Sequence, residues 1–137
     1  MKKYILLLIG MIVSILLSAC ESTTKAAPVV LPAAEDIISI SVSDDHAAAI
    51  CTDGELTGEI ISILMDMEST SKSSVNDFPD VDDYIKIDLN CSDDTVQTVY
   101  FYEENGTEYV EQPYQGIYIP DPALHTIIVD LLSEADS

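Results

Sequence analysis

Alternating apolar and polar residues predict a series of short strands. Isoleucine and valine alternate with serine from Ile38 to Val42, which is typical of a half-buried strand. The same alternation returns in Tyr84 to Leu89 and in Thr95 to Tyr102. Asn105-Gly106 then signals a two-residue hairpin turn, because both residues tolerate positive φ. The remaining expected strands cover residues 47–51, 107–111 and 117–119, the last of them at an edge of the sheet.

Two stretches have helical spacing. Thr52 and Glu55 fit a capping box before the first helix, and Asp121-Pro122 fits an N-cap and first helical residue before the second. The apolar stripes are Leu56, Ile60, Ile63, Leu64 and Met67 in the first helix and Leu124, Ile127, Ile128, Leu131 and Leu132 in the second. The element order is therefore ββαβββ(β)α. It predicts an α+β fold, with an antiparallel sheet of five or six strands and two helices packed on one face.

The N-terminal segment has the pattern of an export signal. Lys2 and Lys3 precede an uncharged run over residues 4–17, which is too short to span a bilayer comfortably. Leu17-Ser18-Ala19-Cys20 fits a lipobox, so the segment resembles the leader of a bacterial lipoprotein. Cleavage before Cys20 would leave a diacylglycerol on its thiol and hold the protein on the extracytoplasmic face of the cell membrane. The alternative is an ordinary signal peptide or an uncleaved anchor.

Three parts follow from this organisation. Residues 1–19 are expected to be the lipoprotein signal peptide. Residues 20–35 contain serine, threonine, alanine and two prolines without periodicity, which predicts a lipidated N-terminus and a flexible tether. Residues 36–137 are long enough to bury one core, so they are expected to form a single domain.

Acidic residues dominate the mature chain. All 25 Asp and Glu residues follow position 19 and face only Lys25, Lys72 and Lys86, a formal balance of −22. Nucleic acid binding requires a basic footprint, and the chain has none. The expected partners are the membrane, through the lipid, and an unidentified envelope protein or glycan.

Cys51 and Cys91 remain once Cys20 is assigned to the lipid. Export permits a disulfide between them, which would close a loop of about 40 residues and stabilise by about 3 to 4 kcal/mol in the chain-entropy model. Two independent buried thiols are the alternative. The sequence leaves this choice open.

Four tyrosines are expected on the sheet face that points away from the helices: Tyr84, Tyr100, Tyr102 and Tyr109. On an uncovered face they would form a semi-apolar patch with hydroxyl groups, which suits contact with a protein or glycan. The alternative is that cross-strand tyrosine pairs simply stabilise the sheet.

An acidic loop over residues 76–83 is the best metal candidate. The carboxylates of Asp77, Asp80 and Asp82 could converge on calcium, which prefers several oxygen ligands on a flexible loop. The loop lacks the glycine of an EF-hand, and Tyr84 stands where the third ligand belongs. A solvated acidic loop is the alternative.

Motifs for catalysis are missing from the sequence. There is no Gly-x-Ser-x-Gly elbow, phosphate-binding loop or His-Glu-x-x-His helix. His46 and His125 have no cysteine at zinc-ligand spacing, so both are interpreted as surface residues. We therefore expect a protein that is not an enzyme, with no catalytic residue and no cofactor beyond the diacylglycerol on Cys20.

Two segments carry a resemblance to known proteins. One runs from Ser74-Val75-Asn76-Asp77 through Pro79 to Val81-Asp82-Asp83-Tyr84-Ile85-Lys86-Ile87, and the other is Glu111-Gln112-Pro113-Tyr114-Gln115-Gly116-Ile117-Tyr118. With them, the region from about Ile38 to Leu132 resembles a domain of unknown function in exported proteins and lipoproteins of low-GC Gram-positive bacteria. The resemblance implies a single exported fold and no particular activity. The cysteine pair departs from the pattern of that family.

Three functions are ranked on these grounds. The leading hypothesis is a lipid-anchored extracytoplasmic module that binds a protein or cell-wall component. The second is a calcium-responsive acidic surface domain that uses the acidic loop. An uncharacterised hydrolase with paired carboxylates is the third.

Overall fold

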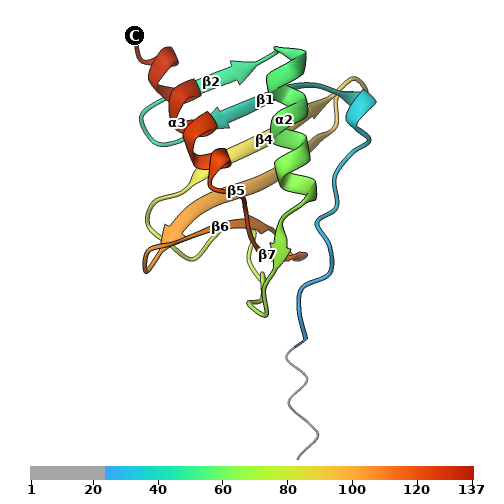
Figure 1. Cartoon of the computed structure of the whole chain (residues 1–137), viewed down its shortest axis with the longest axis vertical. Coiled ribbons are helices and arrows are strands. Elements are labelled where there is room, and N and C mark those ends of the chain that lie inside the picture. The colour runs from blue at the N-terminus through green and yellow to red at the C-terminus, as the bar shows by residue number, and fades with distance from the viewer. Residues whose placement is uncertain (1–23) are drawn as a thin grey trace, which may run out of the picture.

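The computed structural model describes residues 24–137, so the lipobox and Cys20 lie outside the described residues. One antiparallel sheet of seven strands, in the order β2-β1-β4-β5-β6-β7-β3, carries both α-helices on the same face (Figure 1). The elements are η1 (Ala34–Asp36), β1 (Ile37–Ser43), β2 (Ala48–Cys51), α2 (Gly54–Met65), β3 (Glu68–Ser69), β4 (Ile85–Cys91), β5 (Val96–Glu104), β6 (Thr107–Gln112), β7 (Gly116–Ile119) and α3 (Ala123–Ala135). The α+β fold is confirmed, with more strands than expected. Within residues 24–137, no helix has the length and apolar character needed to cross a membrane.

Tight turns connect the strands, as the sequence predicts. Asn105 and Gly106 have φ values of 52° and 79°, and they join β5 to β6. The Asp44 carboxylate accepts backbone N–H groups of His46 and Ala47, at 2.8 and 2.7 Å, and so holds the turn between β1 and β2. These local hydrogen bonds fix antiparallel pairing along the chain.

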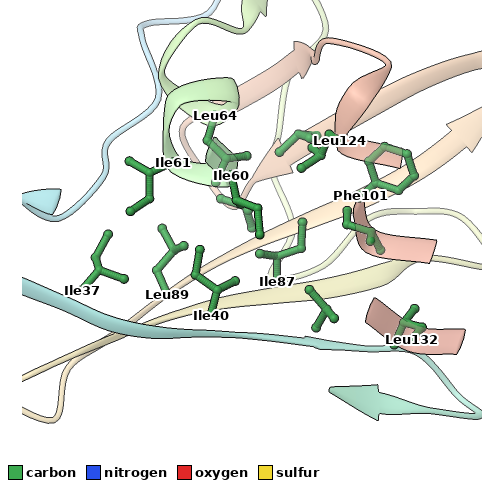
Figure 2. Close-up of a cluster of buried hydrophobic side chains, with 14 of the residues drawn as sticks. Ile37, Ile40, Ile60, Ile61, Leu64, Ile87, Leu89, Phe101, Leu124 and Leu132 are labelled. Atoms are coloured by element: carbon green, nitrogen blue, oxygen red, sulfur yellow. The ribbon is translucent and has the colours of Figure 1, made fainter. Parts of the chain in front are cut away.

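The core lies between the sheet and the two helices. On the sheet side, the register pairs Ile87 with Val99 and places Leu89 beside Ile40 of β1. Figure 2 shows the side chains of both helices directed onto these strands. The helical contribution to the buried cluster is Ile60, Ile61 and Leu64 from α2 and Leu124, Ile128 and Leu132 from α3. Each such side chain contributes about 1.5 to 3 kcal/mol when fully buried, so this layer is the main source of stability.

The strand β3 was not expected from the sequence. It pairs with β7 through Glu68 and Ser69, so β7 is an inner strand and not the expected edge strand. A strand of two residues is too short to show alternation, and its Ser-Thr-rich surroundings predict a loop. The edge of the sheet is therefore one strand further out than the sequence indicates.

The helix starts also differ by one residue from the expectation. Asp53 is the N-cap of α2 and accepts the Leu56 N–H at 2.8 Å, so the expected N-cap Thr52 is wrong. α3 begins after Pro122, and the Asp121 carboxylate accepts the Ala123 N–H at 2.8 Å. In both places an aspartate satisfies an N–H group of the first turn, which is the function of a cap.

The part of the N-terminal segment from Ala26 to Val30 is docked on the sheet, so this part of the expected flexible tether over residues 20–35 is held in place, whereas residues 20–23 lie outside the described residues. The Gln112 side chain accepts the Val30 N–H at 2.8 Å and donates to the Val30 carbonyl at 2.7 Å. The Tyr118 hydroxyl donates to the Ala27 carbonyl at 2.6 Å. These contacts involve sheet residues more than 80 positions away, so the sequence around Pro28 could not indicate them.

Gly116 lies beneath this docked segment. A Cβ at position 116 would overlap the Cβ of Ala26 and crowd the Tyr118 hydroxyl. The close approach of the N-terminal segment to β7 therefore depends on a residue without a side chain.

Candidate functional site

The sheet face opposite the helices is divided into two halves. A covered half, formed by Tyr102, Tyr109, Glu111 and Ile117 of β5, β6 and β7, lies beneath the loop over residues 70–84. An open half, formed by β2, β1, β4 and the adjoining part of β5, includes Ile50, which is 70% exposed. The division separates residues that the sequence pattern places on one common face.

The four predicted tyrosines do share this face, but they do not form one uncovered patch. Tyr102 is only 4% exposed, and its ring centroid lies 5.7 Å from that of Tyr109 in the covered half. Tyr84 and Tyr100 are half-buried and pack edge to face, with ring centroids 5.2 Å apart. The pair of Tyr84 and Tyr100 is therefore the part of the tyrosine face nearest to the open half.

A buried carboxylate joins the loop to the covered half. Glu111 is 5% exposed, and its Oε1 accepts the Ser74 hydroxyl at 2.6 Å. Its Oε2 accepts the Tyr102 hydroxyl at 3.4 Å. Burial, followed by the nearby Glu111 charge, raises the pKa of Tyr102 well above its usual value, so this hydroxyl keeps its proton. Tyr102 and Glu111 also line a cavity of about 240 Å³.

The sequence analysis missed Glu111. Strand alternation places it on this face, but nothing in the pattern of β6 indicates that the position is buried. Burial comes from the loop carrying Ser74, which is 37 residues away in the sequence. Only a prediction of the path of that loop could have identified the residue.

Lys72 connects the outer part of the loop to β5 and β6. Its ammonium group lies 2.7 Å from Glu104 Oε1 and 4.3 Å from the centroid of the Tyr109 ring. The hydrogen bond to Glu104 is the main cause that raises the pKa of Lys72. Both charged side chains are more than a third exposed, so the pair adds little stability.

The open half has a ladder of polar side chains. Asn90 donates from Nδ2 to the hydroxyls of Ser39 and Ser41, at 3.0 and 2.9 Å. On the next pair of strands, the Thr98 hydroxyl donates to Asp88 at 2.5 Å. These groups satisfy one another between neighbouring strands, so their hydrogen bonds need no partner from a loop. They remain available to a partner that can accept or donate further hydrogen bonds.

Cys51 and Cys91 are free, buried thiols, so the candidate disulfide is not formed. Cys51 of β2 pairs with Ile40 of β1, and Ile40 pairs in turn with Leu89 of β4, the strand that carries Cys91. One complete strand thus separates the two cysteines, which places their Cα atoms at least about 10 Å apart. Disulfides need Cα atoms within about 7 Å, so the structure favours the alternative of two independent thiols.

The acidic loop does not assemble the expected calcium ligands. Among the described residues, no three histidine, cysteine, aspartate or glutamate side chains are grouped in a way that could hold a metal ion. Asp77 instead accepts the Tyr114 hydroxyl at 2.8 Å. Asp80 lines the cavity beside Glu111, and Asp82 is exposed. The three carboxylates are thus not brought together as a ligand set.

The two histidines occupy the surface. His46 is exposed in the turn between β1 and β2, beside a pocket of about 270 Å³. His125 is paired through Nδ1 with Glu108, and its ring lies edge-on to Phe101 at a centroid distance of 5.6 Å. Both positions agree with the interpretation of surface residues.

Taken together, the sheet with two helices on one face and a loop across half of the other defines an α+β domain. The chain belongs to the DUF5301 family, whose model, described as "Domain of unknown function (DUF5300)", matches residues 25–119. The predicted membership of an uncharacterised family is therefore confirmed, and the matched region includes the docked N-terminal segment.

A solved structure is similar to this chain. It is described as "NMR structure of the protein from Ruminococcus gnavus" and shares 33% sequence identity, with a TM-score of 0.59. The match covers 68% of this chain and 91% of that chain. The comparison with curated proteins found no match.

Proposed function

We propose that the protein is a lipid-anchored extracytoplasmic module that binds an envelope protein or a cell-wall glycan. The observation that carries the proposal is the open half of the second sheet face. This surface combines an exposed aliphatic residue, Ile50, with a ladder of hydrogen-bonding side chains, and it adjoins a half-buried aromatic pair, Tyr84 and Tyr100. Such a mixture of aromatic, apolar and polar groups is typical of recognition surfaces.

The charge of the chain supports the same choice of partner. A mature chain with a formal charge of −22 repels nucleic acids and teichoic-type polyanions alike, and it attracts neutral or basic surfaces. Lys86 is paired with Asp88 at 3.0 Å inside the open half, so this surface contains a balanced ion pair. A neutral glycan or a protein segment would therefore meet little electrostatic repulsion there.

The lipid anchor is supported by the lipobox that ends at Cys20. Two acyl chains on the same residue give stable attachment, whereas one chain binds only marginally. Globomycin blocks the lipoprotein signal peptidase, so treated cells should accumulate an uncleaved precursor. Normal processing in its presence would overturn the anchor and leave the binding surface to be tested separately.

Crosslinking on living cells tests the binding surface. The tagged lipoprotein is crosslinked and the captured material is analysed by mass spectrometry, for the native chain and for a Tyr84→Ser, Tyr100→Ser double variant. Val129→Ser is the matched control, because Val129 is exposed on α3 at the opposite face. We expect one enriched partner that is lost in the double variant and kept in the control. Equal capture by all three proteins would overturn the proposal.

A further inference from the structure

The docked N-terminal segment fixes where the chain leaves the domain. The Ala26 N–H donates to the Thr70 carbonyl at 2.8 Å, which places this exit beside β3 and β7. Figure 1 shows the segment entering at the β7 end of the molecule, opposite the C-terminal end of α3. Cys20 precedes Ala26 by six residues. Because an extended chain spans at most about 3.5 Å per residue, the lipid-bearing residue is within about 21 Å of this end.

Large apolar side chains are exposed on the loops around the exit. Val75, Phe78 and Tyr114 are 67%, 56% and 66% exposed. The Tyr114 N–H donates to the Ser74 hydroxyl at 3.1 Å, so the two loops that carry these side chains lie side by side. Gln115 in turn donates to the Pro28 carbonyl of the docked segment at 2.9 Å. The exposed apolar groups thus gather close to the point where the chain turns towards its anchor.

Two lysines also lie at this end of the domain. Lys25 and Lys72, two of the three lysines after the signal peptide, line one hollow of about 380 Å³ beside Gly116. Lysine side chains can lie along an apolar surface and keep the ammonium group in water, which suits a membrane interface. Glu68 is paired with Lys25 and Glu104 with Lys72, and Asp77 accepts the Tyr114 hydroxyl. These carboxylates offset the two lysines, so the end has no net basic character. Any contact with lipid must therefore be mainly apolar.

We propose that this end of the domain, formed by residues 71–78 and 113–116, lies against the lipid surface with Val75, Phe78 and Tyr114 in the interface. The inference rests on the proposed lipid anchor. The short connection holds the end near the bilayer, and apolar and aromatic side chains are favoured at the interface between water and lipid. Recognition of anionic head groups plays no part in the contact.

In this orientation the β3 edge of the sheet faces the lipid. Six spacings of about 4.8 Å separate β3 from β2 at the other edge, so β2 lies about 29 Å further from the lipid. The open half of the second sheet face is then the part furthest from the membrane. A partner in the envelope could reach it without displacing lipid.

Site-specific photocrosslinking tests the orientation in the full-length lipoprotein. The photoreactive residue p-benzoylphenylalanine replaces Phe78 in one protein, Val129 of α3 in a second and Ile50 of β2 in a third. All three positions are exposed, so none of these replacements opens the core. Irradiated membranes are extracted, and mass spectrometry reports both lipid adducts and the diacylglyceryl mass on Cys20.

We expect lipid adducts at position 78 and loss of the adduct signal at positions 129 and 50. A protein that carries the diacylglyceryl group but gives no adduct at 78, or equal adducts at all three positions, would overturn the orientation and leave the anchor intact. A protein without the diacylglyceryl mass would overturn the anchor, and the orientation with it. Failure of the orientation therefore appears in the mass of the lipid adduct, and failure of the anchor appears in the mass of the diacylglyceryl group.

Discussion

The two halves of the second sheet face have the same strand pattern and different surroundings. In the covered half, the Glu111 carboxylate depends on a hydroxyl from a loop far away in the sequence. In the open half, Asp88 and Asn90 find partners on the neighbouring strands. A buried polar group without a partner is costly, so the covered half is bound to its loop. The open half needs no such loop, because its polar groups are paired between strands.

Replacing one carboxylate in each half, Glu111 or Asp88, should give the largest difference in stability between the two halves. Glu111→Ala leaves the half-buried Ser74 hydroxyl and the buried Tyr102 hydroxyl without their acceptor, so we expect the free energy of unfolding to fall by about 1 to 3 kcal/mol. Asp88→Ala, the matched change in the open half, should cost less than about 1 kcal/mol because solvent can replace the lost partner. Urea unfolding of both variants measures the difference. Equal losses would contradict the division of the face.

Stability at high pH should also differ between variants of Tyr102, in the covered half, and Tyr100, nearer to the open half. Burial raises the pKa of Tyr102 above its value in the unfolded chain, about 10. The stability that this hydroxyl provides is therefore complete below pH 10 and is lost as the pH rises above it. Tyr102→Phe should reduce the loss of stability above pH 10, because phenylalanine has no hydroxyl to ionise. Tyr100→Phe should have a smaller effect, because burial is the main cause that raises both pKa values and Tyr100 is only half-buried. Thermal unfolding from pH 8 to 11 measures both slopes, and indistinguishable slopes would count against the buried position of Tyr102.

An exposed residue of the open half should matter for binding and not for folding. Ile50 is 70% exposed, so Ile50→Ser should change the free energy of unfolding by less than about 0.5 kcal/mol. In the crosslinking experiment it should reduce partner capture. A large loss of stability would show that Ile50 is covered within the folded chain.

The smallest effect is expected from a reducing agent. Because Cys51 and Cys91 are free, reduction should leave the unfolding midpoint unchanged, and both thiols should react with iodoacetamide after denaturation without reduction. A disulfide between these cysteines would link the strands β2 and β4, which are part of the open half. A mass increase of two hydrogens on reduction would reveal such a bond.

The sequence predicts the parts of the fold that repeat locally. Alternation in Tyr84 to Leu89 and the turn at Asn105-Gly106 specify strands and their antiparallel order, and the stripe around Ile60 specifies a helix. The loop that contains Ser74 and the docked segment that contains Val30 have no period. Their positions are set by long-range hydrogen bonds, among them those to Glu111 and Gln112. For this reason the shared tyrosine face was predictable, and its division was not.

The contact between Gly116 and Ala26 has a consequence for how the protein can change over generations. The two positions share one small space, although they are far apart in the sequence. A larger residue at either position must move the docked segment, unless the other position has already become compatible with the change. We therefore expect the effect of a substitution at one of these positions to depend on the residue at the other. A residue without a side chain in β7 thus sets how closely the N-terminal segment can approach the sheet.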